Sequence, residues 1–293
     1  MKSNYKAKTA SAQYEQQSNV FEMWLLFKDK PVRPEEPVLR AALESKCGKV
    51  DVIASSPELT SFGVKRFMSH FRDADLPAQV MLGNVMPFRQ TDITNAERAQ
   101  IRDIKDRDTF LSSCTHKILA ADMMAALDTE HRTRLLMNWL EVVTDIFKDC
   151  VAVWIPSGGK LIPADLIRSG KVEKQDRFVC FCVNARFFKI EKTDEMLVDT
   201  HGMCAVGLPD IQCHFKNLDA DAVVNYVYNI ASFVMQSRDQ IKDGDTIEGL
   251  NAETSEFDEN VLWTVRYEDA MVQPMRAVID VCPGENAAGE REK

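Results

Sequence analysis

Several short apolar runs in the second half of the chain follow one another with no helical pattern between them. We interpret residues 177–190, 196–206 and 211–215 as consecutive strands. A helix that begins at Asp219, with Val223, Val227, Ile230 and Val234 as its buried stripe, separates them from two more strands at 261–267 and 276–281. A parallel pair of strands needs a long crossover connection, so strands in direct succession pair antiparallel. The sequence therefore predicts an α+β fold with largely antiparallel sheets packed against helices, rather than a doubly wound parallel sheet.

Two strand–helix–strand segments, at residues 20–54 and 117–155, indicate how the chain is organised. Between them, residues 91–112 are charged and weakly apolar, and we expect a linker or a surface helix there. The predicted organisation is a disordered tail (1–18), an N-terminal α+β unit (19–90), the charged linker (91–112), a C-terminal α+β domain (113–283) and a disordered tail (284–293).

The charge balance excludes some classes of partner. Acidic residues outnumber basic ones, 45 to 36, for a formal net charge of −9. Binding to a nucleic-acid backbone or an anionic membrane requires a clustered positive surface, so we expect neither partner. No apolar run approaches the roughly 18 residues of a membrane-spanning helix, and the first twenty residues lack the apolar core of a signal peptide. We therefore expect a cytoplasmic protein whose eight cysteines are reduced thiols.

Two histidines and two cysteines have a spacing that suggests a metal site. They form the pattern H-x2-C-x8-C-H at His201, Cys204, Cys213 and His214. Zinc binds two thiolates and two imidazoles in a tetrahedron. However, Cys213 and His214 are adjacent, and neighbouring side chains in a strand point to opposite faces. The pattern therefore favours no metal, and we expect no cofactor.

The other chemical motifs are incomplete. Cys180 and Cys182 would share one face of a strand, but their apolar neighbours indicate a core position rather than a redox pair. The sequence P-S-G-G-K at 156–160 lacks the spacing and hydroxyl of a phosphate-binding loop. The acidic loop at 239–245 lacks calcium-ligating oxygens at the third and twelfth positions. These motifs indicate turns and core strands.

The segment from residue 199 onward combines three short motifs. It contains D-T-x-G at 199–202, G-L-P-D at 207–210 and D-G-D-T at 243–246. Glycine admits positive φ and proline donates no hydrogen bond, so we interpret G-L-P-D as a turn between two strands. The missing side chains would also let a partner approach the backbone. The candidate binding residues are Asp199, Gly202, Gly207, Pro209, Asp210, Asn225, Asn229, Asp243 and Asp245.

This combination of motifs resembles the C-terminal domain of a bacterial family known as domain of unknown function 4261. The resemblance covers residues 199 to about 249, roughly a quarter of the chain. The family has no assigned activity, so the resemblance implies no catalytic residue. Its motifs contain glycine, proline and acidic residues, and His201, Cys204 and Cys213 do not belong to them.

Three functions are compatible with these features. The first is a non-enzymatic protein that binds another protein, in the manner of an immunity protein, an antitoxin or a regulator. The second is a metal-dependent hydrolase that uses His201 and His214 with Asp199, Asp210, Asp243 and Asp245. The third is a structural subunit of a phage or secretion apparatus. The acidic composition and the incomplete motifs favour the first, and they leave the oligomeric state open.

Overall fold

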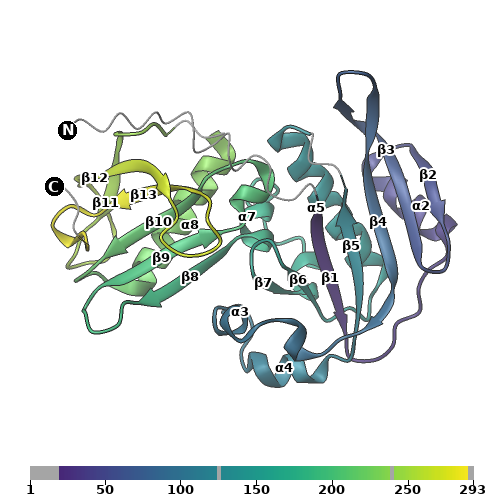
Figure 1. Ribbon diagram of the computed structural model, residues 1–293, viewed down its shortest axis with the longest axis horizontal. Helices are drawn as coiled ribbons and strands as arrows, with labels where there is room; N and C mark the ends of the chain where they lie inside the picture. The colour runs from purple at the N-terminus through teal and green to yellow at the C-terminus, as the bar shows by residue number, and fades with distance from the viewer. Residues whose placement is uncertain (1–19, 124–126, 238–240, 290–293) are drawn as a thin grey trace. The chain divides into compact units, whose positions relative to one another are not determined.

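The computed structural model describes residues 20–123, 127–237 and 241–289. It divides the chain into two compact units, Ser18–Cys182 and Val183–Lys293. Each unit has its own β-sheet and its own helices (Figure 1). The predicted α+β fold is confirmed. No helix within the described residues is both long and apolar enough to cross a membrane.

The N-terminal unit contains a seven-stranded sheet in the order β2-β3-β4-β5-β1-β6-β7. Its strands are β1 (Phe21–Phe27), β2 (Val50–Ser55), β3 (Leu59–His70), β4 (Asp75–Pro87), β5 (His116–Asp122), β6 (Ala152–Ile155) and β7 (Lys160–Pro163). Every neighbouring pair in this sheet is antiparallel. Figure 1 shows β1 between β5 and β6, so the first strand of the unit lies inside the sheet.

Four helices of this unit are α2 (Glu36–Cys47), α5 (Thr129–Ile146), α6 (Ala164–Arg168) and α7 (Arg177–Cys182). Helix α5 begins where Asp128 accepts a hydrogen bond from the His131 N–H at 2.8 Å, a normal N-cap. Its apolar side chains are buried, and α5 packs on α2. A buried ion pair between Arg132 and Asp122, at 3.0 Å, joins α5 to β5.

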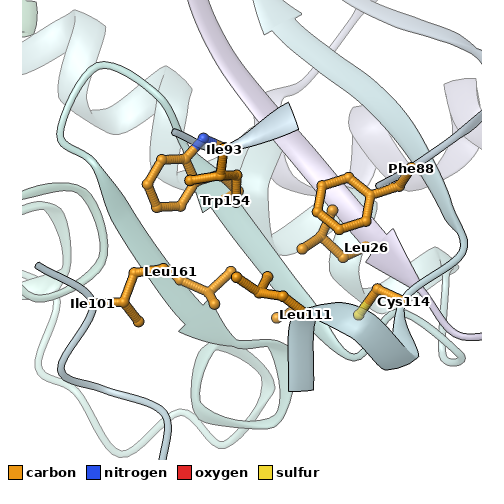
Figure 2. Close-up of a cluster of buried hydrophobic side chains, with 9 residues drawn as sticks. Leu26, Phe88, Ile93, Ile101, Leu111, Cys114, Trp154 and Leu161 are labelled. Carbon is orange, nitrogen blue, oxygen red and sulfur yellow. The ribbon is translucent and has the colours of Figure 1, made fainter. Parts of the chain in front are cut away.

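The segment between β4 and β5 folds back onto the sheet. It contains η1 (Gln90–Asp92), α3 (Asn95–Ala99) and α4 (Arg107–Ser113). Figure 2 shows Ile101 and Leu111 from this segment gathered with Trp154 and Leu161 of the sheet. Ile93 belongs to the same buried cluster. The segment is therefore part of the core, although its apolar residues are too widely spaced to form a periodic pattern in the sequence.

Because segment 91–112 packs into the core of the N-terminal unit, it is not the boundary between two units. Strands β4 and β5 flank that stretch and are hydrogen-bonded neighbours. Strand β5 also pairs with β1, so the expected units 19–90 and 113–283 would each take part of one sheet. The structure divides the chain after Cys182 instead.

The C-terminal unit has a six-stranded sheet in the order β11-β12-β13-β10-β9-β8. Its elements are β8 (Asn184–Lys189), β9 (Met196–His201), η2 (Met203–Val206), β10 (Asp210–Phe215), α8 (Ala220–Ser237), β11 (Thr246–Leu250), β12 (Phe257–Asp269), β13 (Ala277–Cys282) and η3 (Gly284–Asn286). Only the pair β10–β13 is parallel among the pairs of the described strands. Helix α8 lies on one face of this sheet, where the Tyr226 ring is 4.7 Å from that of Trp263.

Three local expectations are wrong. The strand expected at 196–206 ends at His201, and residues 203–206 form the short helix η2. Residues 177–190 form helix α7 and then strand β8, not one long strand, so Cys180 and Cys182 do not share a strand face. Residues 284–289, expected in a disordered tail, form η3 and a β-bridge between Ala287 and Phe215. The small side chain of Ala288 is buried there. The tail expected at 1–18 lies outside the described residues.

Candidate functional site

A row of charged and amide side chains crosses the C-terminal sheet on the face opposite α8. The strand registers place one residue from each of five strands directly opposite the next. Residues opposite one another in paired strands point to the same face. We call this set the polar row, and it consists of Arg186, Asp199, Gln212, Asp280 and Arg266.

The middle of the polar row is buried. Asp199 and Gln212 have no exposed surface, and Asp280 is 1% exposed. Arg186 donates to both carboxylate oxygens of Asp199, at 2.9 and 2.5 Å, and Gln212 donates to Asp280 at 2.9 Å. A buried charge is costly unless it is paired and hydrogen-bonded. Arg186 supplies the opposite charge for Asp199, and Gln212 supplies a hydrogen bond to Asp280.

Arg276 connects the polar row to a second buried carboxylate. It precedes β13 and is 0% exposed. Its guanidinium donates to Asp199 at 2.5 Å and to Asp210 at 2.9 Å, and it also donates to the Thr200 carbonyl at 2.7 Å. Two arginines therefore balance two buried aspartates. Burial lowers the pKa of the Arg276 guanidinium, but the two carboxylates outweigh it and leave that pKa raised, so the group stays charged.

Asp210 also fixes the connection between β9 and β10. Its carboxylate accepts hydrogen bonds from the Thr200 hydroxyl at 3.0 Å and from the Met203 N–H at 3.1 Å. Gly202 has φ 135° and Gly207 has φ 78°, values that favour glycine. The expected turn between two strands is present, and it includes the short helix η2. Burial raises the pKa of the Asp210 carboxyl, while Arg276 opposes that rise.

The same buried side chains hold the connection between β12 and β13, residues 270–276, which we call the methionine loop. Arg276 donates to the carbonyls of residues 272 and 274, at 3.2 and 2.8 Å. Arg186 donates to the Gln273 carbonyl at 2.8 Å, and Gln212 accepts from the Met271 N–H at 2.8 Å. The loop is thus fixed through its main chain. Its side chains Met271 and Met275 are 51% and 39% exposed.

His201 and Cys204 lie beside this network and are both uncharged at neutral pH. Burial, with the nearby charges of Arg276 and Arg186, lowers the pKa of His201 to about 3. Burial and the Asp210 carboxylate raise the pKa of Cys204 to about 12. The thiolate is the nucleophilic and metal-binding form of cysteine, so Cys204 is poorly suited to either role.

The other two residues of the metal pattern point elsewhere. Cys213 lies in a buried row with Val198 and Val281, on the face that α8 covers. His214 points to the opposite face, where its Nε2 is 3.1 Å from a Glu195 carboxylate oxygen. Among the residues described, no three His, Cys, Asp or Glu side chains form a group that could hold a metal ion.

The remaining binding candidates are spread over the unit. Pro209 is buried and Gly207 is exposed in the β9–β10 connection. Asn225 and Asn229 are exposed on α8, on the other side of the sheet from the polar row. The Asp243 carboxylate accepts from the Tyr267 N–H, and the Asp245 carboxylate accepts from the Lys242 N–H, both near the start of β11. The candidates that meet at one place are Asp199, Gly202 and Asp210.

Sequence reasoning missed Arg186, Arg276, Gln212 and Asp280 as members of this network. A signal for two of them was available. Gln212 and Asp280 each stand inside a short apolar strand, where a polar side chain must find a buried partner. The partners come from segments distant in the chain, so the sequence did not reveal which residues pair.

Comparison with known proteins gives one match. Residues 199–282 match the family model Domain of unknown function (DUF4261). This confirms the resemblance and extends it through β12 and β13, so that it includes Arg276 and Asp280. Searches of curated proteins and of solved structures find no match.

Proposed function

We propose that the protein acts by binding another protein through the methionine loop, and that it is not an enzyme. The proposal rests on the hydrogen bonds that hold this loop in place. The side chains of Arg186, Gln212 and Arg276 fix its main chain from residue 271 to residue 274, while Met271 and Met275 stay exposed. A loop that is already ordered loses little conformational entropy on binding. Methionine side chains adapt readily to an apolar partner surface.

The charge near this loop supports a particular kind of partner. In residues 243–269 the only basic residue is Arg266, and Glu268 and Asp269 are exposed directly before the loop. A partner with an apolar contact area and a basic rim would complement this surface. An immunity protein or antitoxin that neutralises a basic protein is the class that fits this chemistry.

The test compares three tagged proteins as baits in lysates of the source cells. They are the wild type, the double variant Met271→Asp/Met275→Asp, and a control, Met123→Asp. Met123 is 40% exposed but belongs to the N-terminal unit. We expect the wild type and the control to capture the same protein, and the double variant to lose it. Circular dichroism confirms that each bait is folded.

Salt gives a second readout of the same experiment. Capture should weaken between about 50 mM and about 500 mM salt, because exposed charges are screened over shorter distances at high ionic strength. If the double variant captures the partner as well as the wild type does, the proposed site is wrong. If no partner is recovered at either salt concentration, protein binding itself is contradicted.

The hydrolase alternative has less support from the site. Asp199 and Asp210 each accept hydrogen bonds from an arginine, and Arg276 bridges the two carboxylates. His201 lies beside this network, whereas His214 pairs with Glu195. We therefore retain protein binding as the proposal.

A further inference from the structure

Helix α8 carries an uncharged surface that is unusual for this chain. Asp, Glu, Lys and Arg make up 28% of all residues, yet none of them, and no histidine, occurs from Ala222 to Ser237. A helix that faces solvent on one side normally carries charged residues on that side. The outer face of α8 instead has the composition of a contact surface.

The exposed side chains of α8 form one line along the helix. Asp221, Asn225, Asn229, Phe233 and Gln236 are exposed and are spaced four, four, four and three residues apart, and the charged one, Asp221, lies in the first turn. Residues at this spacing lie on one helical face. Phe233 is 53% exposed, whereas Val223, Val227, Ile230 and Val234 form the buried face. We call the uncharged part of this line, from Asn225 to Gln236, the amide stripe.

We infer that the amide stripe is a contact surface between two copies of this chain. Each copy has a formal net charge of −9, so two copies repel unless they meet where charge is absent. A twofold interface places the same patch of both copies together, and ionisable groups near its axis would face groups of the same sign. Amide side chains both donate and accept hydrogen bonds, so Asn and Gln are complementary to themselves.

The position of the stripe suggests how the helices pair. The uncharged stretch from residue 222 to residue 237 has its centre between residues 229 and 230. Two α8 helices packed antiparallel about that centre would place each Asn229 next to its counterpart. The stretch is about 24 Å long at 1.5 Å per residue. A contact of that length buries less than the about 800 Å² per partner of a standard interface, so we expect a micromolar dissociation constant.

Sedimentation equilibrium of the full chain tests this inference. We expect the wild type to dimerise between about 1 and about 200 µM, the range in which a micromolar complex forms. Asn229→Asp and Asn229→Lys should each raise the dissociation constant at least about tenfold, because like charges then face each other across the axis. An equimolar mixture of the two variants should dimerise again, because opposite charges then meet.

A control substitution shows whether the effect of an added charge is specific to the amide stripe. Leu262→Asp places a charge on β12, where Leu262 is 60% exposed, and it should leave the dissociation constant unchanged. A wild type that stays monomeric at about 200 µM, or a dimer that either Asn229 variant leaves intact, would overturn the inference. The amide stripe belongs to α8, whereas the methionine loop is held by side chains on the other face of the sheet, so this result does not depend on the proposed function.

Discussion

Arg276 is the residue on which the buried network of the C-terminal unit depends most. It contacts two buried carboxylates and three main-chain carbonyls, and its side chain has no exposed surface. Removing one member of a buried ion pair leaves its partner charged and desolvated, which costs about 3–5 kcal/mol. We therefore expect Arg276→Met to lower the free energy of unfolding of this unit by about that amount. Urea unfolding of the fragment 183–293, whose only tryptophan is Trp263, measures this change by fluorescence.

Arg266→Met is the matched control for this prediction. Arg266 belongs to the same polar row, but its side chain is exposed on β12. Exposed substitutions usually change stability by less than about 0.5 kcal/mol. Equal losses in the two variants would contradict the role assigned to Arg276. A loss below about 1 kcal/mol for Arg276→Met would do the same, since it would fall well short of a buried pair.

His201 makes the stability of the C-terminal unit depend on pH. Its pKa in the folded protein, about 3, lies below the ordinary value of 6.5. The unfolded chain therefore binds more protons between these values, and the His201 contribution to stability is complete above pH 6.5 and declines as the pH falls toward 3. The decline is at most about 1.4 kcal/mol per pH unit.

The variant His201→Gln isolates this contribution from other acid effects. We expect the free energy of unfolding of the wild type to fall between pH 6.5 and 4.5 by up to about 3 kcal/mol more than that of the variant. Urea titrations at the two pH values provide the comparison. Parallel losses in both proteins would show that His201 becomes protonated without cost in the folded state.

At the scale of elements, the sequence predicts those helices whose apolar residues recur at helical spacing. The sequence predicts a helix between two strands in segment 117–155, and helix α5 lies there between β5 and β6. Helix α7 was missed because six mostly apolar residues between Arg177 and Cys182 show no period that separates a buried helix from a buried strand. Segment 91–112 was misjudged because its few buried side chains, including Ile101, are far apart in the chain.

The candidate site was predictable in part for a similar reason. Asp199, Gly202 and Asp210 stand within 12 residues of one another, and a turn brings them together. The Arg276 side chain that joins them lies directly before β13, far along the chain, and the parallel pairing of β10 with β13 brings it there. Which strands pair across such a distance in the chain depends on the whole sheet, so no local sequence pattern predicts it.

At the scale of the whole molecule, the division after Cys182 has a consequence for folding. The C-terminal unit has a complete sheet, with α8 packed on it and Trp263 2% exposed in its core. A unit with its own core can fold alone. We therefore expect the fragment 183–293 to be soluble and to unfold cooperatively in guanidinium. Trp263 is its only tryptophan, so its emission should shift to longer wavelength at the transition.

The fragment 113–293 is the contrasting case, because it begins where the sequence alone placed a domain. It keeps β5, β6 and β7 but lacks β1, which pairs with both β5 and β6. The edges of β5 and β6 would then be exposed, together with apolar side chains such as Ile118 and Val153 that are buried in the full chain. We expect this longer fragment to aggregate on size-exclusion chromatography while fragment 183–293 elutes as a folded species. A soluble, cooperatively folded 113–293 together with an unfolded 183–293 would place the boundary at residues 91–112 after all.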